Sequence, residues 1–141
     1  MSKTNCIPHP SGRSHFGEIP EMATRGVVIP AGLIYLLRGT HLGPNKGFGA
    51  QHIWIEHELE MARLGFGRFE DVPQFVARII QVGSPVFFEG GFNRTTKIAV
   101  VRARSGTAIL QSVHRREGHI WSIVTAFAGT KTHGTKVGTV R

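Results

Sequence analysis

The chain has 141 residues, of which 40% are hydrophobic, and this is enough for one domain with a buried core. Seventeen Lys and Arg against nine Asp and Glu give a formal net charge of +8, which favours polyanionic partners, with nucleic acid ahead of a membrane surface. The single cysteine, Cys6, excludes an internal disulfide and a cysteine-based zinc cluster, and no apolar run approaches the roughly 18 residues that a membrane-spanning helix needs.

The N-terminal segment has the composition of a loop. Residues 1–22 are rich in Pro, His, Ser and Gly, so we expect a flexible N-terminal arm there and a single folded domain over 23–141. Lys3 is followed by Pro8 and Pro10 rather than by an apolar run, and no signal peptide is predicted.

Two parts of the chain have the pattern of β-strands. The stretch 27–38 is rich in β-branched and aromatic residues and is interrupted at Pro30 and Gly32, which predicts one strand or two short ones. In the C-terminal half, apolar runs alternate with turn residues, and Ser105-Gly106 and Glu117-Gly118 mark hairpins. The strands predicted there are 85–88, 96–104, 107–115, 119–127 and 135–140.

The apolar residues of the stretch 50–64 recur with helical spacing. The side of this helix predicted to face the core carries Ile53, Trp54, His57, Met61 and Leu64. Another side, predicted to be solvated, carries His52, Glu56, Glu60 and Arg63.

A second, shorter helix is predicted after Asp71, a suitable N-cap, with Pro73 in its first turn. Its apolar positions are Phe75, Val76, Ile79 and Ile80. Helices followed by an antiparallel meander define an α+β domain.

The most informative stretch for function is 47–57. Gly47-Phe48-Gly49 is typical of a turn, and it would also leave backbone N–H groups at the helix start for an anion such as phosphate. His52 and His57 follow, and histidine exchanges protons near neutral pH. His57 is either a catalytic residue or a core histidine bonded to a backbone carbonyl. The two histidines lie five residues apart rather than four, which argues against a shared metal ion, so no metal is predicted.

Alternation along the last two long strands assigns their faces. On the strand from His119, Trp121, Ile123, Thr125 and Phe127 fall on one side. On 96–104, Lys97 lies on the more apolar side, at an edge where a cation could meet a ligand, and Arg102 lies on the other.

These residues together resemble a known family. The order Gly47-Phe48-Gly49, His52-Ile53, His57, a basic strand and then Trp-Ser-Ile-Val-Thr-Ala-Phe at 121–127 resembles the BECR group of metal-independent ribonucleases, the barnase, EndoU, colicin and RelE-like superfamily. The resemblance covers about residues 33–140 and is closest to the phage and polymorphic-toxin branches, which include contact-dependent inhibition toxins. It implies N-terminal helices packed on a central twisted antiparallel sheet, with the active site in the cleft between them.

Residue by residue, the resemblance implies that His57 is the first candidate for a catalytic histidine and His52 the second. Thr125 matches the Thr of a Thr-x-Tyr pattern in the final strand, whereas Phe127 stands at the aromatic position and lacks the hydroxyl. The catalytic cation is one of three basic residues: Lys97, Arg94 or Arg102. The residues expected to bind RNA or phosphate are Arg94, Arg102, Gly47, Gly49 and Phe127.

We therefore expect an endoribonuclease toxin that cleaves RNA, with tRNA as a candidate substrate, by attack of the 2'-OH to give a 2',3'-cyclic phosphate. This reaction needs a base, an acid and a group that stabilises phosphorane charge, and no cofactor. His57 would be the base or the acid, Lys97 or Arg94 would hold phosphate oxygens, and Thr125 would donate a hydrogen bond to one of them.

The expected partners are RNA and an acidic cognate immunity or antitoxin protein, with no membrane. The expected place of action is the cytoplasm of the host or target bacterium, including delivery as a secreted effector. Two alternatives stay open: a non-catalytic RNA-binding or protein-interaction module on the same fold, favoured by Phe127, and a metal-dependent nuclease that uses His52 and His57.

Overall fold

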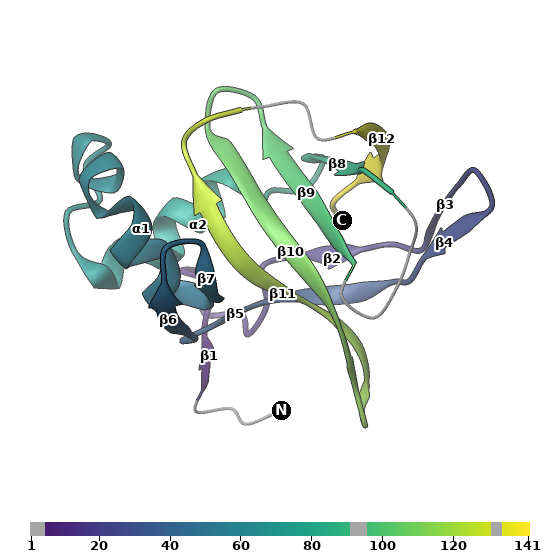
Figure 1. The fold of residues 1–141 in the computed structure, drawn as a ribbon, viewed down its shortest axis with the longest axis horizontal. Coiled ribbons are helices and arrows are strands. Elements are labelled where there is room, and N and C mark those ends of the chain that lie inside the picture. Colours follow the sequence, from purple (N-terminus) through teal and green to yellow (C-terminus); the bar gives the residue numbers. More distant parts are fainter. Residues whose placement is uncertain (1–4, 91–95, 131–133) are drawn as a thin grey trace.

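The computed structural model describes residues 5–90, 96–130 and 134–141. Within this part of the chain the fold is α+β (Figure 1). Along the sequence, one group of strands precedes the helices and a second group follows them. The strands before the helices are β1 Cys6–Ile7, β2 Glu18–Ile19, β3 Met22–Thr24, β4 Val27–Ile29, β5 Gly32–Leu37, β6 Thr40–Gly43 and β7 Lys46–Phe48. The helices are α1 Gly49–Arg63, the short 3-10 helix η2 Phe69–Asp71 and α2 Val72–Ile79. The later strands are β8 Pro85–Phe88, β9 Lys97–Arg102, β10 Gly106–Arg115, β11 Gly118–Phe127 and β12 Thr135–Thr139.

The main sheet has the strand order β1-β5-β11-β10-β9-β8-β12, and β2 also pairs with β5. The predicted meander is confirmed over β8 to β11, where all neighbours are antiparallel. β5 pairs parallel to β11, however, so the sheet is mixed rather than antiparallel. β5 takes this inner position because its sequence, Gly-Leu-Ile-Tyr-Leu-Leu, is apolar enough for a strand with neighbours on both edges.

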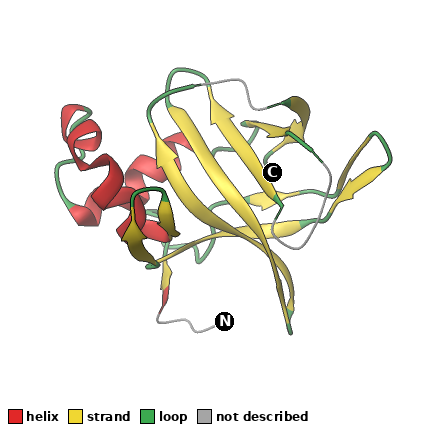
Figure 2. Ribbon diagram, viewed as in Figure 1, coloured by secondary structure: helices red, strands yellow, loops and turns green. Residues whose placement is uncertain are grey.

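The expectation that helices form the N-terminal part needs correction. Strands β1 to β7 precede α1, and the two helices lie next to each other (Figure 2), with α1 against β11 and α2 against β9 and β10. The stretch 27–38 forms two strands, β4 and β5, separated at Pro30-Ala31.

The N-terminal segment is part of the fold, which corrects the expectation of a loose arm for residues 5–22; residues 1–4 lie outside the described part. β1 and β2 pair with β5, and the side chains of Phe16 and Ile19 are 1% and 0% exposed. The backbones of Glu18 and Arg141 exchange two hydrogen bonds of 2.8 Å, which join this segment to the C-terminus. The many Pro and Gly do produce loops, but a few apolar side chains anchor them in the core.

α2 is confirmed close to its predicted form, with Pro73 in its first turn. The predicted apolar residues Phe75, Val76, Ile79 and Ile80 are all at most 2% exposed. Asp71 stands at the N-cap, but its carboxylate accepts a hydrogen bond of 3.2 Å from Arg68 N rather than capping α2. Among the described residues no helix is both long and apolar enough to cross a membrane.

α1 follows the predicted range but is not regular. His57 has φ −130° and ψ 19°, which interrupts the helix and turns its last part. Ile53 and Met61 are fully buried as predicted, whereas Leu64, expected on the same side, is 42% exposed. Leu64 is the C-cap residue, with φ −92° and ψ 2°, so it lies beyond the last helical residue, where the helical projection no longer applies.

β11 contains a β-bulge that the sequence pattern does not reveal. Ile109 of β10 pairs with Thr125, but the next residue, Leu110, pairs with Ile123, so Val124 is an extra residue in β11. Leu110 is buried in the core, and Ile109 beside it points to the other face. Thr125 therefore shares the outer face with Ile109.

The predicted common face of Trp121, Ile123, Thr125 and Phe127 is wrong for this reason. Trp121 and Ile123 are fully buried in the core, while Thr125 and Phe127 are half-buried on the outer face. One extra residue reverses the alternation of every residue after it.

The packing of the N-terminal segment can be tested with Phe16→Ala. We expect this change to lower the free energy of unfolding by about 3–5 kcal/mol, as for other buried Phe residues. The control Val82→Ala removes an apolar side chain that is 78% exposed and should change stability by less than about 0.5 kcal/mol. Urea unfolding measures both, and a small loss for Phe16→Ala would mean that the segment contributes little to the core.

Candidate active site

The candidate site lies where α1 meets the second half of β11. β5 pairs with β11 at Ile120–Ser122, and beyond these residues α1 and β7 contact β11 instead. The β6–β7 hairpin packs on the start of α1. The fold thus brings the helix that carries the histidines to the strand that carries Thr125 and Phe127, although the two elements are far apart in the sequence.

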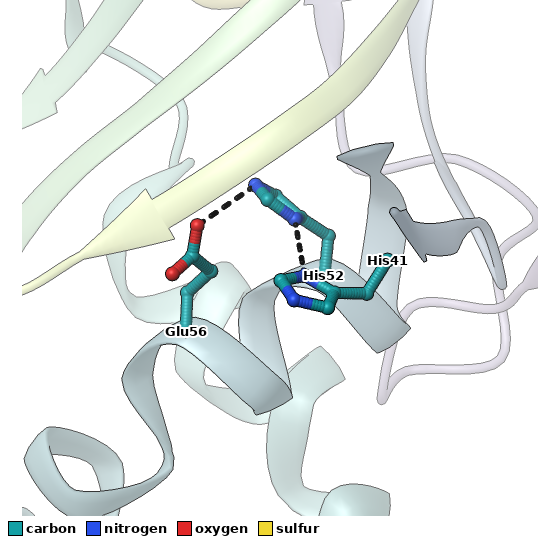
Figure 3. A group of neighbouring side chains, drawn as sticks. All are labelled: His41, His52 and Glu56. Carbon is teal, nitrogen blue, oxygen red and sulfur yellow. Dashed lines mark hydrogen bonds and ion pairs between the residues drawn. The ribbon is translucent and has the colours of Figure 1, made fainter. Parts of the chain in front are cut away.

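His52 is 3% exposed, which corrects its predicted place on a solvated side of the helix. The β6–β7 hairpin covers this side and brings in His41, a residue that the sequence analysis did not select. The Nδ1 atoms of His52 and His41 are 3.1 Å apart, and the two rings stack with centroids 5.2 Å apart (Figure 3). Since two nitrogens this close share one hydrogen bond, one ring donates and the other accepts.

Glu56, one turn after His52, completes this cluster. Its Oε1 lies 3.7 Å from His52 Nε2 and accepts a hydrogen bond of 2.7 Å from Asn45 N (Figure 3). That backbone hydrogen bond lowers the pKa of Glu56, so the group is a carboxylate at neutral pH. A carboxylate facing Nε2 favours a proton on Nε2, which leaves Nδ1 of His52 to accept the hydrogen bond from His41.

The surroundings of His52 keep it neutral. Burial lowers its pKa below the 6.5 of an unperturbed histidine; the Glu56 carboxylate opposes this shift, and the charges of His41 and His57 add to it. All four groups are therefore within electrostatic reach of one another.

His57 lies beside a second carboxylate. Its Nδ1 lies 3.1 Å from Glu60 Oε2, and its ring packs against Phe127 with centroids 5.9 Å apart. Glu60 Oε1 accepts a hydrogen bond of 3.1 Å from Ala128 N at the end of β11. Glu60 was also expected to be solvated; instead its Oε1 joins the helix to the strand, and its Oε2 lies beside the His57 ring without hydrogen-bond geometry.

Thr125 has an unused hydroxyl. Its Oγ1 is buried and makes no hydrogen bond to any described residue. Buried hydroxyls usually have a partner, and one without a partner marks a place where a ligand or water can supply it. Thr125 shares the outer face of β11 with Phe127, the residue against which His57 packs.

The predicted cations are not brought together. Lys97 is exposed on the outer face, which it shares with Thr125, but the strand register places it about 10 Å across and about 7 Å along the sheet. Arg102, five residues further along a regular strand, lies on the opposite face. Arg94 lies outside the described residues.

The two glycines have a structural role. Gly47 and Gly49 have φ of +133° and +82°, values that favour glycine. A Cβ at Gly47 would collide with Thr40 O and lie 3.0 Å from His52 Nδ1. Gly47 thus makes room for the His52 ring. At the helix start, Gln51 N already donates a hydrogen bond of 2.9 Å to Arg38 O, so that N–H does not serve a phosphate.

A cavity lies elsewhere, at the far end of the β10–β11 hairpin. It has a volume of about 740 Å³, and its lining includes Tyr35, Arg115 and His119. Arg115 Nε is shielded from solvent and makes no hydrogen bond to a described residue. This cavity contains none of the α1 histidines, and it offers an additional place for an anionic group.

Comparisons of the chain with protein-family models, with curated proteins and with solved structures find no match. The chemistry open to the site follows from its own groups: two histidine systems, each beside a carboxylate, and a hydroxyl that can donate to a ligand. Such a set can take up one proton and deliver another without a metal ion.

The role of Gly47 can be tested with Gly47→Ala. Gly118 has almost the same φ, +135°, but a Cβ there meets nothing within 4 Å, so Gly118→Ala is a matched control for backbone strain alone. We expect both variants to lose about 1–3 kcal/mol of stability from strain and Gly47→Ala to lose more from the collision. Urea unfolding gives the difference, and equal losses would show that the neighbours of Gly47 can move away.

The electrostatics of His52 can be tested by NMR titration of its ring protons. In the wild type the pKa of His52 should lie below 6.5, because burial disfavours the charged ring. In Glu56→Gln it should fall further, because the carboxylate that favours the charged ring is gone. A rise of the pKa in this variant would contradict the assigned pairing.

Proposed function

We propose that this chain is a metal-independent endoribonuclease of the BECR type that acts as a toxin, with tRNA as a candidate substrate. The observation that carries the proposal is that α1, on which His52 and His57 each lie beside a carboxylate, packs against β11, where the buried Thr125 hydroxyl has no hydrogen-bond partner among the described residues. The meander β8 to β11 with both helices before it in the chain supports a BECR-like arrangement.

A proton-transfer scheme follows from the His41–His52 hydrogen bond and the 3.7 Å contact of Glu56 with His52. In the row Glu56, His52, His41, the carboxylate holds a proton on His52 Nε2 and His52 Nδ1 accepts from His41 Nδ1, which leaves the lone pair on His41 Nε2. His41 would then be the base that takes the 2'-OH proton, and His52 and Glu56 would stabilise the charge that develops on it. His41 thus enters the site beside the two histidines predicted from the sequence.

His57 is suited to be the acid. Glu60 Oε2 lies 3.1 Å from its Nδ1, which leaves Nε2 as the nitrogen that would give a proton to the leaving 5'-oxygen. The Thr125 hydroxyl would donate a hydrogen bond to a phosphate oxygen as charge builds up on it. Phe127 would hold the His57 ring by packing rather than act through a hydroxyl.

The positive charge of the chain supports RNA and an acidic protein as the proposed partners. A formal charge of +8 favours binding of the RNA backbone. The same charge favours an acidic immunity or antitoxin protein, whose association it would accelerate.

The proposal is tested by incubating the protein with purified tRNA in EDTA, followed by a denaturing gel and end-group analysis. The wild type should give fragments that end in a 2',3'-cyclic phosphate and should leave DNA intact, because DNA lacks the 2'-OH. His57→Ala should slow cleavage by about 10²–10⁴-fold, the usual contribution of an acid or base. Thr125→Val should slow it by about 10²-fold or more.

His114→Ala is the matched control, because His114 is exposed and lies outside the cluster. It should cleave at the wild-type rate. Salt-dependent binding of tRNA without cleavage would instead indicate a non-catalytic RNA-binding module, the alternative that Phe127 favours.

A further inference from the structure

The cluster of His41, His52 and Glu56 has a second chemical capability besides proton transfer. Each of these residues offers a ligand atom, and the three atoms lie within 4.8 Å of one another. Two imidazoles and one carboxylate form a donor set that Zn²⁺ accepts well, with water in the fourth position.

The distance between the two histidines fits an ion. In tetrahedral zinc, two nitrogens at about 2.0–2.1 Å from the metal are about 3.3 Å apart. The His41 and His52 Nδ1 atoms are 3.1 Å apart, so their spacing is close to that of two zinc ligands, and turning of the two rings would direct both lone pairs at an ion. The Glu56 carboxylate faces Nε2 of His52 rather than Nδ1, so it would have to move further to reach the same ion. Its side chain is half-buried and has rotatable bonds.

The support of the ligands also suits a metal site. His52 and Glu56 are at i and i+4 on α1, the helical spacing that lets two ligands share an ion, and His41 comes from the paired β6–β7 hairpin. Asn45 N, in the turn of the same hairpin, holds one oxygen of Glu56. The spacing of His52 and His57, which argued against a metal, does not apply to this set.

We infer that His41, His52 and Glu56 form a binding site for Zn²⁺ or a similar first-row divalent ion. The ion would occupy the histidine nitrogens that the proposed mechanism needs for proton transfer. On the proposed function it would therefore inhibit RNA cleavage, and this consequence rests on that function, whereas the binding site itself does not.

The test is direct binding of ZnCl₂ to the purified chain, measured by competition with a chromogenic chelator. The wild type should bind one ion saturably, and His41→Ala and Glu56→Gln should each weaken this binding by about 100-fold or more, since even residues outside the ligand shell contribute about 10–100-fold. Circular dichroism checks that both variants are folded; Glu56→Gln preserves the size of the side chain.

Two matched controls separate this site from other histidines. His57→Ala removes the neighbouring histidine and His114→Ala removes an exposed one, and both should keep the wild-type affinity. Equal affinities for wild type, His41→Ala and Glu56→Gln, or loss in His57→Ala instead, would overturn the inference. Because the readout is binding, it decides the metal site whether or not the chain cleaves RNA.

Discussion

The parallel pairing of β5 with β11 stops after three residues, and the candidate site depends on where it stops. Up to Ser122 the edge of β11 is occupied by β5; beyond it, the edge is open to α1 and β7. The parallel arrangement requires a long connection between the two strands, and this connection contains the β6–β7 hairpin and both helices. The histidines and carboxylates of the site are thus carried by this connection, which folds back on the strand that carries Thr125 and Phe127.

The β-bulge at Val124 determines what α1 meets on that strand. Without the extra residue, Thr125 and Phe127 would follow Trp121 and Ile123 into the core, as simple alternation predicts. With it, the strand keeps a sealed core face and still presents a hydroxyl and an aromatic ring on its other face. The Thr125 hydroxyl is buried and has no hydrogen-bond partner among the described residues, which costs stability.

The sequence predicted the local elements well because they depend on local signals. The strands from 85 to 140, the range of α1 and the buried side of α2 follow from alternation, helical spacing and turn residues. The parallel pairing of β5, the kink at His57 and the bulge at Val124 depend on contacts between distant segments. The periodicity of the sequence does not predict them. His41 is the clearest case: it lies in a polar turn-rich stretch, and only the pairing of β6 with β7 brings it to His52.

Glu56 and Glu60, the two carboxylates of α1 that lie beside histidines, have similar backbone partners but act on histidines with different burial. Each accepts a hydrogen bond from a backbone N–H outside the helix, Asn45 for Glu56 and Ala128 for Glu60, so each carboxylate is held by the main chain of a β-element. Glu60 acts on a half-buried His57, whereas Glu56 acts on a buried His52 whose charged form is disfavoured. The two histidines therefore differ in their surroundings: burial lowers the pKa of His52, whereas His57 is half-buried and packs against Phe127. At the inferred metal site, the shared proton and the cation would compete for the Nδ1 atoms of His52 and His41.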